Sequence, residues 1–112
     1  LNVCLENIDI VSLCAGTHNE KSCEILADLM HEKGIANNDQ RVWFAQLLGM
    51  SDHISFNLAD QDYNVAKYVP FGPVRHVMPY LLRRAEENTS VAGQMGRELR
   101  LINEEVARRK NR

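Results

Sequence analysis

The chain has 112 residues, of which 45% are apolar and 25% are charged, so its composition is that of a globular protein with one modest core. The net charge of -2 argues against a general attraction to nucleic acid or an anionic membrane, and no apolar run approaches the ~20 residues that span a bilayer. Three cysteines without C-x-x-C spacing favour small buried thiols in a reducing compartment over disulfides or a zinc site.

The first elements predicted along the chain are a strand and a helix. Residues 8–15 form a short apolar run rich in β-branched side chains, which indicates a strand, and Gly16 breaks it. Residues 17–20, with the sequence THNE, match a T-x-x-E capping box in which the threonine is the N-cap of a helix. We expect this helix to extend to about Lys33 and to end at Gly34, because glycine accommodates the left-handed conformation that commonly terminates helices.

The same order of strand and helix recurs twice. Residues 41–48 predict a second strand, and Ser51 or Asp52 would cap a shorter helix after it. Residues 64–69 predict a third strand, and a helix follows over about residues 74–88.

Three strand–helix units in a row predict parallel strands joined by helical crossovers, and therefore an α/β fold. A doubly wound sheet and a (β/α)8 barrel both fit this local order. A barrel of about 250 residues allots roughly 31 to each unit, so the chain would hold three or so units of an incomplete barrel. Because three parallel strands leave open edges and an uncovered core, we expect the remaining strands to come from a longer polypeptide.

The composition shifts after the third unit. We expect residues 1–92 to form the barrel-like portion and residues 93–112 to form a basic C-terminal helical tail. The tail is expected to fray over residues 108–110, and a charge run of this kind usually keeps a protein soluble, so no nucleic-acid partner is expected.

Candidate functional residues follow the first and third predicted strands. Ligands of α/β folds bind at the carboxyl ends of the strands. There, Thr17, His18 and Asn19 combine a hydroxyl, an imidazole and backbone N–H groups at a helix N-terminus, which suits a phosphate, although a capping box alone explains the same residues. Tyr68 near the end of the third strand would reach the same edge, although a strand tyrosine is more often packing.

The last strand–helix unit carries the most specific pattern. Tyr80, Arg83, Arg84 and Glu87 fall at i, i+3, i+4 and i+7, so they share one stripe of a helix. Two adjacent arginines are costly to bury unpaired and well suited to clamping a small substrate's carboxylate. Pro79 removes a backbone donor, so this helix is either kinked there or begins there.

Other reactive residue types are assigned structural roles. The four histidines have no H-x-x-x-H or H-E-x-x-H spacing, so no metal site is expected, and His31 and His76 are expected on exposed helix faces. Trp43 and Met50 are interpreted as core in preference to pocket wall.

Four ordered motifs together resemble one family. They are residues 16–20 (GTHNE), 43–50 (WFAQLLGM), 68–72 (YVPFG) and 80–88 (YLLRRAEEN), and in this order they resemble the C-terminal part of proline dehydrogenase over residues 8–96. The resemblance implies a distorted (β/α)8 barrel with noncovalent FAD, which oxidises L-proline to 1-pyrroline-5-carboxylate, passes hydride to flavin N5 and then electrons to a quinone.

The resemblance also implies roles for single residues on the cofactor side. Thr17 and His18 match a Thr-His pair that contacts the flavin cofactor, and Asn19 follows them. Glu87 matches an acidic residue that would hold an arginine or a cofactor hydroxyl.

On the substrate side, Tyr68 matches the tyrosine that shapes the proline pocket, and it is the one residue to which we assign a catalytic role. Tyr80, Arg83 and Arg84 match the Y-x-x-R-R motif whose arginines pair with the substrate carboxylate.

Other flavin and pocket contacts of the family are absent from this chain, so we expect the chain to be inactive without the remainder of the barrel. The residues of the motifs favour a bacterial, cytoplasmic member of the family, with peripheral membrane association left open. If the source is eukaryotic, a mitochondrial location is expected. Two alternatives remain: another α/β enzyme that clamps a carboxylate or phosphate, and a non-catalytic interaction module whose arginine pair binds an acidic partner. The sequence does not distinguish proline from hydroxyproline, and it fixes neither the quinone nor the oligomeric state.

Overall fold

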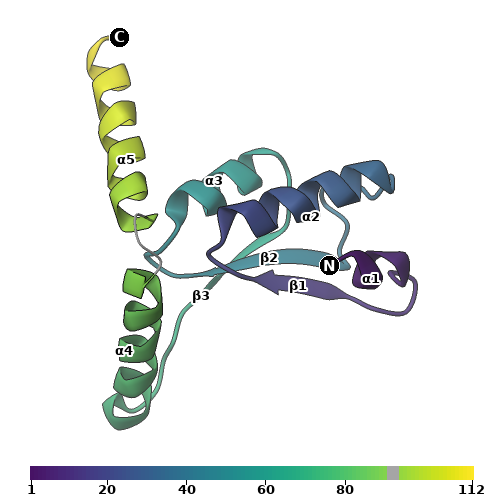
Figure 1. Cartoon of the computed structure of the whole chain (residues 1–112), viewed down its shortest axis with the longest axis horizontal. Coiled ribbons are helices and arrows are strands. Elements are labelled where there is room, and N and C mark those ends of the chain that lie inside the picture. The colour runs from purple at the N-terminus through teal and green to yellow at the C-terminus, as the bar shows by residue number, and fades with distance from the viewer. Residues whose placement is uncertain (91–93) are drawn as a thin grey trace. The chain divides into compact units, whose positions relative to one another are not determined.

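The computed structural model describes residues 1–90 and 94–112 and contains a small α/β unit followed by two helices (Figure 1). The elements are α1 (Asn2–Glu6), β1 (Leu13–Gly16), α2 (Glu20–Glu32), β2 (Val42–Leu47), α3 (Asp52–Asp60), β3 (Val65–Tyr68), α4 (Val74–Ser90) and α5 (Gln94–Lys110). They form two compact units, Leu1–Val69 and Pro70–Arg112. The domain boundary predicted between residues 92 and 93 lies outside the described residues. Among the described helices, none has both the length and the apolar character to cross a membrane.

The three strands form one parallel sheet in the order β1-β2-β3. In the register, Leu13 lies opposite Val42, and Phe44 lies opposite Val65. The predicted α/β class with three parallel strands is therefore confirmed, and the barrel that would close around them stays a prediction.

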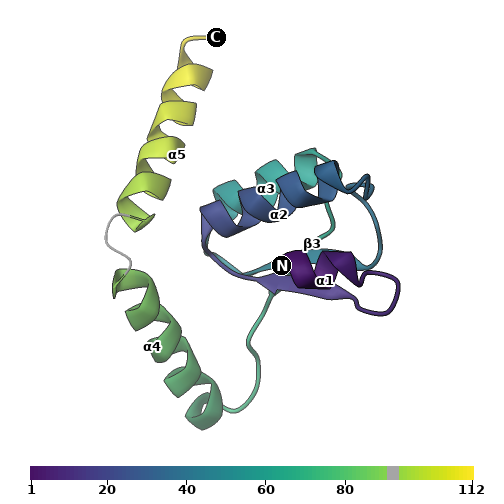
Figure 2. The same ribbon diagram turned by 45° about the vertical axis from the view of Figure 1, so that its right-hand side comes forward.

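Helices α2 and α3 lie side by side over one face of the sheet (Figure 2). Phe44 at 0% exposure and Val42 at 1% point from β2 into this layer, where they pack with Leu26 and Met30 of α2 and Ile54 of α3. Because successive strand residues point to opposite faces, this packing fixes which side chains of each strand face away from the helices.

Trp43 was expected in the core, and this expectation is wrong. It lies between Val42 and Phe44 on β2, so its side chain points to the opposite face, where it is 41% exposed and its indole N–H donates to the Gln40 carbonyl. Within residues 1–69, no helix covers this face.

The first segment also departs from prediction. The strand begins only at Leu13, because only residues 13–16 have partners on β2, and residues 7–10 form a turn in place of the predicted strand. The short helix α1 was not predicted, and its Leu5 enters the core at 2% exposure. A five-residue helix carries too few turns to produce a recognisable periodicity.

The ends of α2 show one error and one confirmation. The N-cap is Asn19, whose side chain accepts a hydrogen bond from Ser22 N at 3.1 Å, so Thr17 is not the N-cap and the predicted T-x-x-E box does not form. At the other end, Gly34 has a φ of 69°, its N–H donates to the carbonyl of His31, and Ile35 N–H donates to the carbonyl of Met30. This pair of bonds is the Schellman arrangement, so the predicted glycine terminus is confirmed.

In the second unit, α4 includes Pro79 in its interior, so the helix does not begin there. Helix α5 continues to Lys110, and the predicted fraying over residues 108–110 is wrong. Arg108 and Arg109 both donate to Glu105, at 2.6 and 2.8 Å, and these hydrogen bonds lower the pKa of Glu105 to about 2. Side-chain pairs one turn apart thus support the last turn of the helix.

The exposure of the three cysteines and of two histidines can be compared with the sequence predictions. Cys23 is buried and Cys4 is half-buried, as expected for small core thiols, but Cys14 is exposed on the sheet face that lacks helices. His31 and His76 are exposed, as predicted.

Replacement of Gly34 tests the cap of α2. Gly34→Ala should lower the free energy of unfolding by about 1 kcal/mol, because an L side chain is disfavoured at the observed left-handed φ. Gly16→Ala is the matched control in the same unit. Gly16 lies outside that φ region and nothing lies within 4 Å of an added Cβ, so a change below about 0.5 kcal/mol is expected. Urea unfolding followed by circular dichroism measures both, and equal effects would contradict the cap.

Candidate functional site

The carboxyl ends of the three strands meet at one edge of the sheet, because the strands are parallel and adjacent. The segment after β1 holds Thr17, His18 and Asn19, the loop after β2 holds Ser51, and β3 ends at Tyr68. Segments far apart in the sequence therefore supply side chains to the same edge.

His18 joins the segment after β1 to the loop after β2. Its Nε2 accepts a hydrogen bond from the Leu47 N–H at 3.3 Å, and its Nδ1 lies 2.8 Å from Ser51 Oγ. Both ring nitrogens are thus engaged by the protein. A ligand at this edge would meet the face or the carbon edge of the ring.

Thr17 and Asn19 order the start of α2. Thr17 Oγ1 accepts from Asn19 N at 3.0 Å, while Thr17 N donates to the carbonyl of Ala45 on the neighbouring strand. The hydroxyl proton of Thr17 can still be donated, and the N-terminus of a 13-residue helix carries partial positive charge. This combination suits an anionic group.

Gln46 supports the same segment from within the sheet, and sequence reasoning missed it. Its side chain is 2% exposed, its Nε2 donates to the carbonyl of Thr17 at 3.2 Å, and its Oε1 accepts from Ser55 Oγ at 2.9 Å. The sequence feature that could have revealed this role is a glutamine at a core position of an otherwise apolar strand. A buried amide is retained only where its polar atoms are paired.

Lys67 fixes the loop between β2 and α3, and it was also missed. Its Nζ lies 2.7 Å from the carbonyl oxygen of Met50, 3.0 Å from Asp52 Oδ1 and 3.5 Å from the carbonyl oxygen of Leu47. One half-buried ammonium group therefore binds three points of a single loop. No spacing motif signals this role, because the partners are mainly backbone carbonyls.

Tyr68 is 54% exposed at the end of β3. Its strand position places it on the same sheet face as the exposed Trp43 and Cys14, away from α2 and α3. The Tyr68 ring is therefore not buried as packing within the first unit.

In the second unit, the predicted stripe on α4 forms a cluster around Arg84. The guanidinium carbon of Arg84 lies 5.2 Å from the centre of the Tyr80 ring, and its Nη2 lies 2.8 Å from Glu87 Oε1. The Nε atom of Arg84 is buried and has no hydrogen-bond partner among the described residues. Arg83 is exposed. The convergence of this group with Tyr68 stays a prediction.

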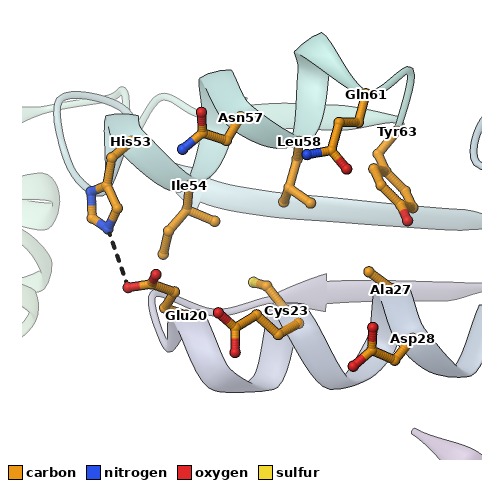
Figure 3. Close-up of a pocket in the computed structure, with 11 residues that line it drawn as sticks. Glu20, Cys23, Ala27, Asp28, His53, Ile54, Asn57, Leu58, Gln61 and Tyr63 are labelled. Atoms are coloured by element: carbon orange, nitrogen blue, oxygen red, sulfur yellow. Dashed lines mark ion pairs between the residues drawn. The ribbon is translucent and has the colours of Figure 1, made fainter. Parts of the chain in front are cut away.

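A separate groove of about 440 Å³ lies between α2 and α3, on the helix side of the sheet (Figure 3). Glu20, Glu24 and Asp28 line it from α2, and His53 Nε2 lies 3.8 Å from Glu20 Oε2. Burial, together with the charges of Glu20 and Glu24, raises the pKa of the Cys23 thiol at this groove, so the thiol is kept neutral and is a poor nucleophile. Within residues 1–90 and 94–112, no three His, Cys, Asp or Glu residues are grouped to hold a metal ion.

Comparisons with known proteins identify a family. The family model described as proline dehydrogenase matches residues 1–97. The chain is 39% identical to "Proline dehydrogenase 1, mitochondrial" of Drosophila melanogaster over 97% of its length and 18% of that protein. It is 48% identical to the Homo sapiens protein of the same name, over 83% of the chain and 16% of that protein.

A third relative carries a different name. The chain is 43% identical to "Hydroxyproline dehydrogenase" of Xenopus laevis, over 88% of the chain and 21% of that protein. The chain thus spans about a fifth of the length of these relatives. No solved structure matches it significantly.

Replacement of Lys67 tests the support of the β2–α3 loop. Lys67→Met should lower the free energy of unfolding by about 1–3 kcal/mol and speed amide hydrogen exchange in α3, because buried carbonyl groups lose a charged donor. Lys21→Met is the matched control. Lys21 forms an exposed pair with Glu24 at 3.5 Å, and the control should change stability by less than about 0.5 kcal/mol. Unchanged exchange in Lys67→Met would show that the ammonium does not hold the loop.

Proposed function

The chain belongs to the proline dehydrogenase family of oxidoreductases, and we propose that it forms part of an enzyme that oxidises L-proline to 1-pyrroline-5-carboxylate with FAD and a quinone. The chain corresponds to a fragment of its relatives, so we propose that activity requires the remainder of the barrel. The single observation that carries the proposal is the Arg84 cluster on α4, with Arg83 exposed beside it.

The arginine pair is proposed to bind the substrate carboxylate. Arg84 is held by the Tyr80 ring and by the Glu87 carboxylate, and its side chain is still 36% exposed, so the accessible part of the guanidinium can meet a further acceptor. A carboxylate is the acceptor that suits this geometry best, and Arg83 offers a second guanidinium one residue away. Charge-assisted hydrogen bonds of this kind contribute about 1.5–3 kcal/mol each.

The oxidation itself requires orientation above all. A hydride leaves the proline ring carbon next to nitrogen, the ring nitrogen loses its proton, and a C=N bond forms. When bound, FAD supplies the hydride acceptor. The residues of this chain fix the carboxylate end of proline, while Tyr68 and Tyr80 are proposed to wall its ring and exclude water, so that the reacting C–H bond is held in one place.

The segment from Thr17 to Asn19 is proposed to bind FAD. The partial positive charge of the α2 N-terminus and the available proton of the Thr17 hydroxyl fit an anionic cofactor group. The His18 ring would contact the cofactor through its face or carbon edge, because both nitrogens are engaged within the protein. Of the two roles expected for Glu87, holding an arginine is supported by its 2.8 Å contact with Arg84, and contact with a cofactor hydroxyl stays a proposal.

A mitochondrial location is proposed. The proline dehydrogenase relatives of Drosophila, cattle and human carry that location in their names, which favours it over the cytoplasmic, bacterial assignment expected from the motifs. Both proline dehydrogenases, at 39% and 48% identity, and a hydroxyproline dehydrogenase, at 43%, are similar to the chain, and we propose proline as the substrate because the matching family model is described by that name.

Replacement of each arginine in the complete protein tests the clamp. Arg83→Lys and Arg84→Lys should each raise KM for proline about tenfold to one hundredfold, because lysine cannot reproduce a forked, bidentate contact. The flavin absorbance should persist, since these side chains act on the substrate. Arg75→Lys, an exposed arginine near the start of the same helix, is the control and should leave KM unchanged.

The same protein also distinguishes the alternatives. A yellow protein whose flavin absorbance bleaches on addition of proline supports the proposed function. A colourless, well-folded protein that does not respond to proline would contradict it and favour an interaction module.

A further inference from the structure

The hydrogen bonds of His18 specify its protonation state. The Leu47 backbone amide can only donate, so the Nε2 atom that receives its hydrogen bond carries no proton. A neutral imidazole must then carry its proton on Nδ1, which faces Ser51 Oγ at 2.8 Å. Ser51 is therefore the acceptor of that proton, and its hydroxyl oxygen is what stabilises the Nδ1–H tautomer.

Ser51 itself is held independently of His18. It is 4% exposed and has a left-handed backbone with a φ of 52°, a conformation that costs a residue other than glycine some free energy and that persists only where the surroundings impose it. Its carbonyl accepts hydrogen bonds from Ile54 N at 3.1 Å and from Ser55 N at 3.2 Å. Lys67 binds the residues on either side, at the carbonyl of Met50 and the carboxylate of Asp52. These contacts hold Ser51 in place without His18, so the position of Ser51 determines the orientation of the imidazole ring.

A second support acts on the neighbouring residue of the same segment. Gln46 donates to the carbonyl of Thr17, and Ser55 donates to Gln46. The segment after β1 is thus fixed at the Thr17 backbone from the sheet and at the His18 ring from the β2–α3 loop. Groups fixed before a ligand arrives lose less conformational entropy when it binds.

We propose that Ser51 is a positioning residue of the cofactor site, which holds His18 in one tautomer and ring orientation and so presents the Thr17-His18-Asn19 segment to the flavin cofactor. The assignment rests on the proposed function, because that segment is the proposed contact with FAD. Ser51 touches neither substrate nor cofactor in this role. It acts through the imidazole.

Two substitutions separate the hydroxyl from the backbone of Ser51. Ser51→Ala removes the hydroxyl and keeps the unfavourable φ, whereas Ser51→Gly removes the hydroxyl and relieves that φ. If Ser51 served only to form the turn, Ser51→Gly would keep the wild-type tautomer of His18 and bind FAD at least as tightly as the wild type. If the hydroxyl positions His18, both variants lose the single His18 tautomer and bind FAD more weakly.

Ser55→Ala is the matched control. Ser55 is buried to the same extent, at 4% exposure, and its hydroxyl lies 2.9 Å from Gln46 Oε1 and 3.3 Å from the Ser51 carbonyl oxygen. Ser55→Ala therefore weakens the support of the loop and of Thr17 but keeps the Ser51 hydroxyl, so it controls for the tautomer readout and not for FAD affinity. It reproduces the loss of a buried serine hydroxyl and leaves the His18–Ser51 contact in place.

The first readout is the tautomer of His18, from the ring 15N shifts of the complete protein labelled with 15N-histidine, with the signal assigned by its loss in His18→Asn. The wild type and Ser55→Ala should show Nδ1–H, and both Ser51 variants should show a mixture of tautomers. An Nε2–H tautomer in the wild type would overturn the proposal, as would an unchanged tautomer in both Ser51 variants.

The second readout is the dissociation constant of FAD for the same proteins. Both Ser51 variants should bind FAD about three- to tenfold more weakly than the wild type, consistent with loss of one supporting hydrogen bond. Wild-type affinity in Ser51→Gly would overturn the positioning role. Failure of the wild type itself to bind FAD would refute the proposed function, and the nitrogen shifts would still report whether Ser51 holds the ring.

Discussion

The parallel register of the three strands is the constraint on which the rest of the first unit depends. It brings three carboxyl ends to one edge, and the alternation of side chains sends Val42 and Phe44 toward α2 and α3 while Trp43 and Tyr68 point the other way. An apolar core on one face and exposed aromatic side chains on the other are consequences of this single arrangement. The same register places the segment after β1 beside the loop after β2, where His18 contacts Ser51.

The carboxyl edge is organised by polar groups that are buried and paired. Gln46, Ser51 and Ser55 are all less than 5% exposed, and each has hydrogen-bond partners within the edge. Such groups would destabilise the fold if they lacked partners, so their presence inside an otherwise apolar layer demands a specific geometry. Lys67 extends this pattern, because it binds two backbone carbonyls of the loop and the Asp52 carboxylate with a single ammonium group. Order at the edge therefore comes from the surrounding sheet and loop.

Sequence reasoning succeeded where a feature is periodic or local. The strand–helix order, the glycine terminus at Gly34 and the helical stripe from Tyr80 to Glu87 follow from spacing alone, and the structure contains all three. It failed where the outcome depends on a partner distant in sequence. Asn19 displaces Thr17 as N-cap because the strand continues to Gly16 and Thr17 N bonds to Ala45, which a local capping pattern does not include. The roles of Gln46 and Lys67 were invisible for the same reason, since their partners lie 9 to 29 residues away.

The two adjacent arginines of α4 are not equivalent, although their sequence pattern treats them as a pair. Each of them lies three or four residues from both Tyr80 and Glu87, so helical spacing alone would allow either one to contact that pair. In the structure Arg84 makes both contacts and is restrained on two sides with its Nε buried, while Arg83 is exposed. A restrained guanidinium sets the direction of an incoming carboxylate, and an exposed one can close on it afterwards at the cost of its own side-chain entropy. In the carboxylate clamp that we propose, Arg84 would thus be the fixed half and Arg83 the adaptable half, a division that comes from the contacts of Arg84 with Tyr80 and Glu87.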